Sequence, residues 1–245
     1  MTQPGTGRPR WAPPPRPVRY RPSVRLASTV RAFVITSLGV EVVYTLTGWW
    51  LATTPRAAGF DYNDQDRPYA TSDSVDLVVS MFRFGLLLVT AGVVIAWLWR
   101  VRGNAGQLAV ARHRRSLVWV WLSWFVPVVN LWFPYQVVAD VHRASDPYLD
   151  PWDGELRRPA PRWLLLWWWP WLLASLADLV ASQVWAQQQV GPDALVVAAT
   201  VQTVGGAATV VAGLYLLRAV RTVQADQWAR AERYRAELPD WIRTG

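Results

Sequence analysis

The chain has 245 residues, of which 52% are hydrophobic and 17% charged, and its formal net charge is +8. With 18 Trp and several long apolar runs, this composition excludes an ordinary soluble domain, whose apolar runs are short and broken by charged faces. The absence of cysteine excludes disulfides, thiol catalysis and cysteine-ligated metals.

All 25 basic residues are Arg, which we interpret as codon bias in a GC-rich bacterial genome. In a multispanning protein, Arg gathers on cytoplasmic loops, where it orients the chain and contacts anionic lipid headgroups. Nucleic-acid binding is disfavoured, because no stacking platform or basic groove accompanies the arginines. The expected partners are therefore the lipid bilayer and its anionic headgroups.

The chain begins with a Pro/Arg-rich arm, residues 1–25, which holds six Arg and the run PPPRP. The arm lacks the apolar core of a secretory signal peptide and is typical of a disordered, polyproline-prone segment. It offers a polyproline ligand to a protein partner.

Four apolar windows follow, and each is long enough to span a hydrocarbon core, which takes about 20 residues. They are Ala32–Ala52, Val75–Trp99, Trp163–Ala186 and Ala194–Leu217. We therefore predict an all-α membrane protein with a transmembrane domain over 26–217 and a cytoplasmic helical tail over 218–245. The expected location is the bacterial cytoplasmic membrane.

The apolar stretch 117–145, between the second and third windows, is interrupted before it can cross a bilayer. Pro127 and Pro134 each remove a helical hydrogen bond, and Asn130 between them fits a turn better than a helix interior. The second arm, Tyr135–Ser145, is amphipathic and suits the lipid–water interface. We predict a re-entrant or interfacial helical hairpin.

Arginine counts indicate how this hairpin is placed. The Arg-rich segments are the stretch through Arg31, 100–116, 143–162 and the tail from Arg218. If 117–145 crossed the membrane once, the last two segments would lie outside the cell, against the positive-inside rule. A hairpin that returns to the same side places all four segments, and both termini, in the cytoplasm.

Polar residues within the spans are costly, so they are the first functional candidates. Counted at about 1.5 Å per residue, four of them fall in one layer of the outer half of the bilayer. The layer consists of Glu41, Arg83, Asp178 and Gln202. One interpretation is a structural Arg83–Glu41 ion pair whose remaining hydrogen bonds the other two residues complete. The alternative is an ion or solute site at the bundle centre. In both cases we expect Arg83 to contact Glu41 or Asp178.

Tryptophan is concentrated in the hairpin and in the cytoplasmic half of the third window. This half-helix contains Trp167, Trp168, Trp169, Pro170 and Trp171. Trp favours the headgroup level of a bilayer, but three consecutive Trp point in different directions around a helix, so some must face protein. We predict that the hairpin docks here through Trp–Trp and Trp–Pro contacts, with Trp124 near Trp168.

The chain carries no HExxH, GxSxG or Walker motif. Its two histidines, His113 and His142, lie in or beside basic segments, and we interpret both as surface or interfacial residues. We therefore assign no catalytic residue, no metal ligand and no cofactor.

The hairpin and its flanks carry a pattern that resembles a known family. The pattern consists of Arg102-Gly-Asn104-Ala105, His113-Arg-Arg-Ser116, Trp124-Phe-Val-Pro127-Val-Val-Asn130-Leu-Trp-Phe-Pro134-Tyr-Gln136, Arg143-Ala-Ser145 and Trp168–Trp169. It is similar to the bacterial membrane family catalogued as domain of unknown function 4328, over roughly residues 30–230. The resemblance implies a multispanning module with cytoplasmic appendages. The candidate residues of the hairpin are Trp124, Pro127, Asn130, Pro134, Gln136, Asp140 and Arg143.

The leading hypothesis is a non-enzymatic membrane module for scaffolding, sensing or envelope maintenance. The first alternative is a small transporter or channel that uses the polar layer, and a continuous polar cavity reaching Arg83 would favour it. The second is an intramembrane enzyme, for which His142, Asp140 and Asn130 would have to converge on one pocket.

Overall fold

The structure, a computed structural model, describes residues 20–57, 70–108, 113–148, 156, 159–185 and 192–237. Its elements are α1 (Val24–Ala57), α2 (Ala70–Leu108), α3 (Trp119–Leu122), η1 (Val129–Leu131), α4 (Phe133–Ser145), η2 (Arg162–Leu164), α5 (Leu165–Trp185) and α6 (Pro192–Glu237). Most of the predicted N-terminal arm, residues 1–19, and the end of the predicted tail lie outside the described residues.

Every assigned element of the described part is helical, and four helices contain a stretch long and apolar enough to cross a membrane. These stretches are Val24–Thr53, Val75–Leu108, Arg162–Gln183 and Asp193–Arg233. The prediction of an all-α chain with four such helices is therefore confirmed. At one end the helices run past the predicted windows, since α2 continues beyond Trp99 and α6 beyond Leu217. Both helices pack against α4.

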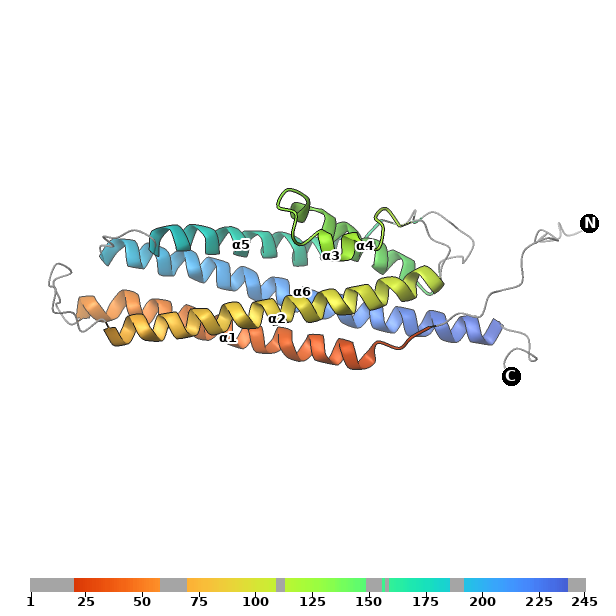
Figure 1. The fold of residues 1–245 in the computed structure, drawn as a ribbon, viewed down its shortest axis with the longest axis horizontal. Helices are drawn as coiled ribbons and strands as arrows, with labels where there is room; N and C mark the ends of the chain where they lie inside the picture. Colours follow the sequence, from red (N-terminus) through yellow and green to blue (C-terminus); the bar gives the residue numbers. More distant parts are fainter. Residues whose placement is uncertain are drawn as a thin grey trace, which may run out of the picture.

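The four long helices lie along one common direction (Figure 1), and α1 packs on both α2 and α6, while α5 packs on α6. α1 and α2 are antiparallel, because Ser37 hydrogen-bonds Thr90 at 2.9 Å whereas the later residue Glu41 meets the earlier residue Arg83. Within the described residues, α2 and α5 have little direct packing. The backbones of these two helices are therefore not closely packed, and long side chains must make the contacts between them.

Glycines on α6 let its backbone approach α1 closely. A Cβ atom on Gly206 would lie 2.8 Å from Thr45 Oγ1, and one on Gly213 would lie 2.7 Å from the Leu38 side chain. Both separations are too short for a real Cβ atom. Small residues at these positions bring the helices together in the way that is common between membrane helices, where packing replaces the hydrophobic effect.

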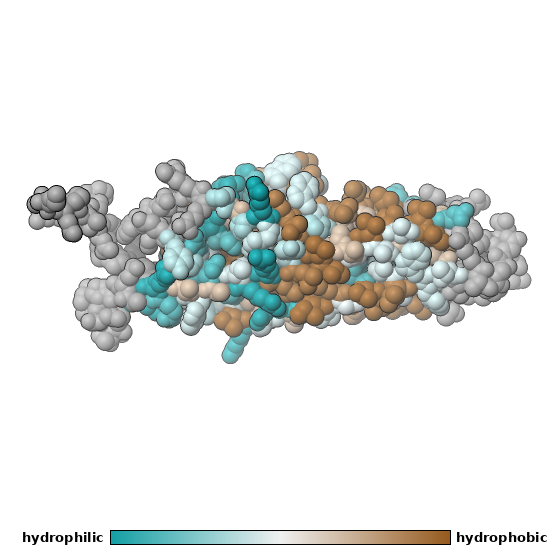
Figure 2. All heavy atoms as spheres, turned by 180° about the vertical axis from the view of Figure 1, so that it is seen from behind, coloured by the Kyte–Doolittle hydropathy of each residue, from teal (hydrophilic) through white to brown (hydrophobic). Residues whose placement is uncertain are grey.

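Large apolar side chains cover the outside of the long helices, as expected for surfaces that face lipid. Examples are Leu77, Val78, Met81, Phe82, Phe84, Leu88, Leu176 and Leu179. Figure 2 shows this apolar surface as a band, with polar residues gathered towards one end of the bundle. We call it the basic end, because it holds Arg25, Arg31, Arg100, Arg102, Arg143, Arg218 and Arg221. The main buried core lies close to it and includes Trp97, Leu98, Val101, Val120, Val141, Leu164, Val220 and Val223.

The stretch 117–145 folds as two helical arms, α3 and α4, joined through η1. Pro127 lies between α3 and η1, and Asn130 lies in η1, where its backbone N–H donates to Val126 O at 2.8 Å. Pro134 occupies the first turn of α4, where its missing N–H leaves no carbonyl unsatisfied. The predicted break is therefore present at Pro127, whereas Pro134 begins a helix instead of interrupting one.

The amphipathic arm α4 is buried on both of its stripes. Val138 and Val141 of the apolar stripe are buried, and so is Asp140 of the polar stripe, at 1% exposure. The reason is that α4 packs against both α2 and α6, so its polar face meets other side chains instead of water.

Candidate functional site

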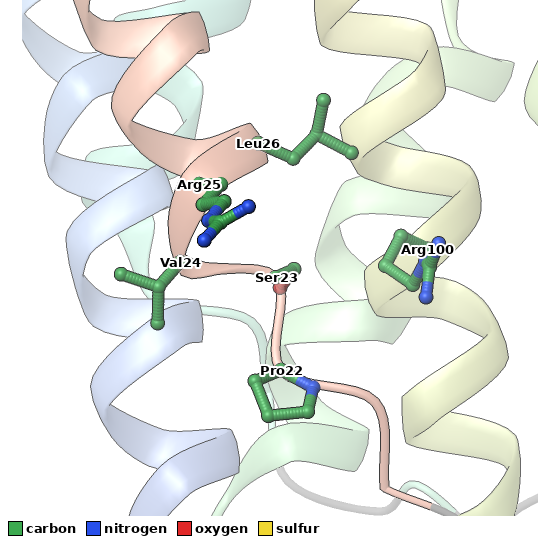
Figure 3. A pocket seen from close by; sticks show the side chains of 6 residues that line it. All are labelled: Pro22, Ser23, Val24, Arg25, Leu26 and Arg100. Carbon is green, nitrogen blue, oxygen red and sulfur yellow. The ribbon is translucent and has the colours of Figure 1, made fainter.

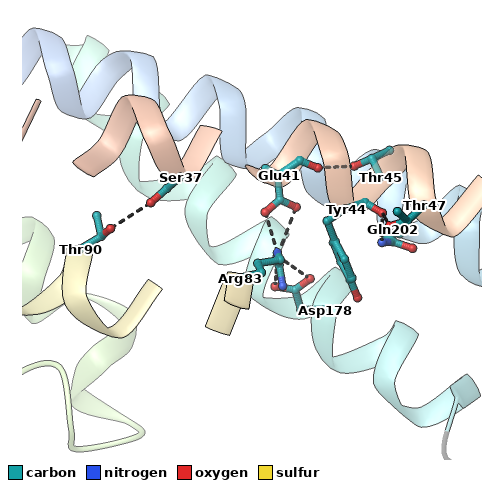
Figure 4. Close-up of polar contacts among 9 residues, drawn as sticks. All are labelled: Ser37, Glu41, Tyr44, Thr45, Thr47, Arg83, Thr90, Asp178 and Gln202. Atoms are coloured by element: carbon teal, nitrogen blue, oxygen red, sulfur yellow. Dashed lines mark hydrogen bonds and ion pairs between the residues drawn. The ribbon is translucent and has the colours of Figure 1, made fainter. Parts of the chain in front are cut away.

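Three charged side chains from three helices form a network within the apolar part of the bundle (Figure 4). Arg83 of α2 donates from Nε to Glu41 Oε2 of α1 at 2.7 Å and from Nη2 to Glu41 Oε1 at 3.2 Å. The same Nη2 donates to Asp178 of α5, at 3.1 Å to Oδ1 and 2.9 Å to Oδ2. The predicted contact of Arg83 is thus confirmed with both carboxylates. We call these three residues the charged triad.

The charged triad is enclosed unevenly. Glu41 is 5% exposed, and the Tyr44 ring centroid lies 4.6 Å from the centre of the Arg83 guanidinium. The Asp178 side chain is 41% exposed, because α2 and α5 pack little against each other in the described residues, and Arg83 bridges the two helices here. Two carboxylates therefore share one guanidinium in the apolar part of the bundle.

Gln202 lies near this layer but serves a different contact. Its Nε2 donates to Tyr44 O at 2.9 Å, and a Cβ atom on Gly48 would collide with its side-chain amide. The expectation that Gln202 completes the hydrogen bonds of Arg83 is therefore wrong. The register of α6 on α1 turns Gln202 towards Gly48, where the missing side chain leaves room for the amide.

The hairpin docks on the Trp-rich start of α5. Trp168 Nε1 donates to Leu131 O at 2.9 Å, and the Trp124 ring makes edge contacts with Trp168 and Trp171 at centroid distances of 6.4 and 5.9 Å. Trp168 and Trp171 stack at 5.1 Å. The predicted Trp–Trp docking is confirmed. Trp167 is also buried, whereas Trp169 is 64% exposed, so consecutive Trp do face different surroundings.

A buried polar cluster joins α2, α4 and α6 at the basic end. Gln227 of α6 is fully buried and donates from Nε2 to Val101 O at 2.8 Å and to Ser145 Oγ at 3.1 Å. Its Oε1 accepts from Asn104 Nδ2 at 3.3 Å. Sequence reasoning missed Gln227. The signal was present, because Gln227 continues the stripe of Val220 and Val223 at helical spacing.

The carboxylate of Asp140 holds the segment that precedes the hairpin. It accepts from the backbone N–H of Arg114 at 2.8 Å and from Arg143 Nη1 at 2.9 Å. Next to it, Arg115 Nε donates to Gln136 Oε1 at 3.0 Å. These residues of the predicted motif therefore anchor the hairpin, and Asp140 is fully engaged by cations and donors.

The enzyme hypothesis requires His142, Asp140 and Asn130 to converge, but these three residues lie in different surroundings. Asp140 lies among arginines, and the His142 ring packs edge-on against Trp163 at 5.6 Å. Asn130 Oδ1 is buried in the hairpin without a hydrogen-bond partner in the described part of the chain. The geometry brings no pair of them into contact there.

His113 is half-buried, and burial together with the positive charge of Arg102 lowers its pKa from 6.5 to about 4. Neither of its ring nitrogens has a hydrogen-bond partner among the residues that the structure describes. Burial also lowers the pKa of His142. Both histidines are thus partly buried and not fully exposed. Their interpretation as surface or interfacial residues stays a prediction.

These shifts predict a loss of stability in mild acid. Well above pH 6.5 His113 is neutral in both states, but as the pH falls through 6.5 towards about 4 the unfolded chain takes up the proton first. The free energy of unfolding should therefore decrease over this interval. Replacing His113 with Phe should flatten the decrease, measured by chemical unfolding at several pH values. Parallel curves for the wild type and H113F would contradict the assignment.

In the described part of the chain, fold and site together define a helical protein with four helices long and apolar enough to cross a membrane and a Trp-docked hairpin beside them. The chain belongs to the family described as Domain of unknown function (DUF4328), which matches residues 60–225. The match is shorter than the predicted 30–230 and begins after α1, so it includes Arg83 and Asp178 but not Glu41. Comparisons with curated proteins and with solved structures give no match.

Proposed function

We propose that the chain is a non-enzymatic membrane module, for scaffolding, sensing or an envelope-associated role, whose working surface is its basic end. The four long helices would cross the cytoplasmic membrane of a bacterium, with both termini and the basic end in the cytoplasm, as the positive-inside rule favours. The hairpin would enter from that side and return to it. The observation that carries the proposal is the buried polar cluster, whose hydrogen bonds join α2, α4 and α6 beyond the apolar band.

The interactions of the candidate residues support this reading over catalysis. Gln136 and Asp140 hold the hairpin to arginine side chains and backbone, and Ser145 meets Gln227. The polar atoms of this motif are occupied by hydrogen bonds within the fold. This is expected of residues that maintain the structure, and not of residues that react with a substrate. The short hydrogen bonds within the charged triad likewise support a role in fixing the register of three helices.

One observation favours transport as the second candidate. The side chain of Asp178 is 41% exposed at membrane depth, and the charged triad carries one uncompensated negative charge. A proton or another monovalent cation would neutralise it.

Complementation of a deletion strain separates the two candidates. The variant E41L/R83M/D178L removes the charged triad, and R162Q/R221Q removes two exposed arginines from the basic end. With both variants present at equal abundance in the membrane, we expect the first to restore the wild-type phenotype of the deletion strain and the second to fail to do so. Failure of the first alone would favour transport, and restoration by both would contradict the proposed working surface.

The orientation is tested by fusions at residue 245. Green fluorescent protein at this position should fluoresce, and alkaline phosphatase should be inactive, because the first folds in the cytoplasm and the second requires export. An active phosphatase fusion would place the basic end outside the cell and overturn the topology.

A further inference from the structure

We propose that the basic end binds the phosphodiester headgroup of an anionic phospholipid between the first turn of α1 and α2. A depression of about 390 Å³ lies there. Its lining residues are Pro22, Ser23, Val24, Arg25, Leu26 and Arg100. Figure 3 shows Arg25 on α1 and Arg100 on α2 on two sides of the depression, with Ser23 between them. This inference rests on the proposed placement of the basic end at the cytoplasmic membrane surface.

The wall of the depression is held in place by hydrogen bonds from two other helices. Asn104 of α2 accepts from Arg21 N at 3.3 Å and donates to Arg21 O at 2.9 Å. Gln224 of α6 donates to Ser23 O at 3.0 Å and to Ser23 Oγ at 2.7 Å. The segment that leads into α1 is thus tethered on both sides, and Ser23 is buried at 3% exposure. The position of Arg25 relative to α2 follows from this tether.

Among the described residues, the two arginines have no carboxylate that neutralises them. No ion pair within the described residues involves Arg25 or Arg100. Two guanidinium groups beside one depression repel each other, and an anion between them relieves that repulsion. Guanidinium groups bind phosphate oxygens through paired N–H donors, so phosphate chemistry suits the site. The unpaired N–H groups of the first turn of α1 add to the attraction.

The depth of the depression points to a lipid rather than a soluble anion. At about 1.5 Å per residue, Arg25 lies about 24 Å along α1 from Glu41, and Arg100 lies about 26 Å along α2 from Arg83. Both are therefore at one level, on the same side of the charged triad. Nearby Trp99 is 39% exposed, as Trp often is at the headgroup level.

Apolar side chains beside the depression suit the acyl chains of the same lipid. Val24 is 59% exposed and also borders a second depression of about 170 Å³, between α1 and α6, which Arg31 and Arg221 line. Basic side chains thus flank the first turn of α1 on both faces. Basic pockets between helices at the cytoplasmic surface are typical sites for anionic phospholipids.

The test is native mass spectrometry of the full chain with added phosphatidylglycerol, using phosphatidylcholine as the uncharged comparison. Each arginine is expected to contribute about fivefold to binding, so R25Q/R100Q should bind phosphatidylglycerol about 25-fold more weakly. The control R233Q/R235Q removes the same charge from the end of α6, where Arg235 pairs with Glu232, and should bind as the wild type does. R25K/R100K keeps the charge but loses the paired N–H donors, so its binding should fall between that of the wild type and that of R25Q/R100Q.

If R233Q/R235Q bound phosphatidylglycerol as weakly as R25Q/R100Q does, the effect would come from net charge alone, and the proposed site would be wrong. Unchanged binding by R25Q/R100Q would contradict the site as well. Glycerophosphate added in excess should leave phosphatidylglycerol bound; displacement would assign the depression to a soluble anion instead. Because the assay uses purified protein, its outcome is independent of the complementation and fusion tests of the proposed function.

Discussion

Replacing Arg83 with Met is expected to lower the free energy of unfolding by about 3–5 kcal/mol. The guanidinium is the only cation that contacts Glu41 and Asp178 in the described residues, through four hydrogen bonds. Without it, two carboxylates remain without their cation in the apolar part of the bundle, and the bridge between α2 and α5 is lost. Unfolding in increasing SDS, followed by circular dichroism of the protein in mixed micelles, measures the change.

The triple variant E41L/R83M/D178L is the matched control for this prediction. It removes the bridge and the charges together, so no uncompensated carboxylate remains. Replacing a complete buried ion network with apolar residues of similar volume is often neutral or stabilising. We therefore expect the triple variant to be at least as stable as wild type. A triple variant as unstable as R83M would mean that the bridge, and not the unpaired charge, determines stability.

Replacing Trp168 with Ala is expected to destabilise the fold by about 3–5 kcal/mol and to release the hairpin. Trp168 is 3% exposed, stacks on Trp171, contacts Trp124 and donates to Leu131 O. Its removal takes away the main contact surface between α5 and the hairpin. Thermal unfolding measures the loss of stability, and faster limited proteolysis within 117–145 reports undocking.

Two further substitutions separate the parts of this effect. Trp168→Phe keeps an aromatic ring but loses the hydrogen bond to Leu131 O, so it should cost about 1 kcal/mol. Trp169→Ala removes a neighbouring Trp that is 64% exposed and should change stability by less than about 0.5 kcal/mol. Comparable losses for Trp168→Ala and Trp169→Ala would rule out specific docking.

Several features were predictable because a bilayer and a helix impose simple distances. The four long helices follow from apolar length, and the charged triad follows from a rise of about 1.5 Å per residue, which places Glu41, Arg83 and Asp178 at one depth. Trp docking followed from three adjacent Trp, which cannot all face lipid.

Other features depended on contacts that no local pattern contains. Gln227 lies on the part of α6 that was expected to be a cytoplasmic tail, and it is buried because α2 and α4 both pack around it. Asp140 belongs to a polar stripe that the sequence pattern predicts to be exposed. In the structure Arg114 and Arg143 surround its carboxylate. Gln202 shares the depth of the charged triad but is turned towards Gly48 by the packing of α6.

The amino-acid sequence by itself determined the helical class, the four long apolar helices, the break at Pro127 and the gathering of arginines into a few segments. The tertiary structure decided which side chains meet: Arg83 with both carboxylates, Gln227 with Ser145, and Arg25 beside Arg100. The physical reason is that the depth of a residue and the face of the helix on which it lies can both be predicted by counting residues along one helix. Contacts depend also on the order of the helices and on their rotation, which long-range packing sets.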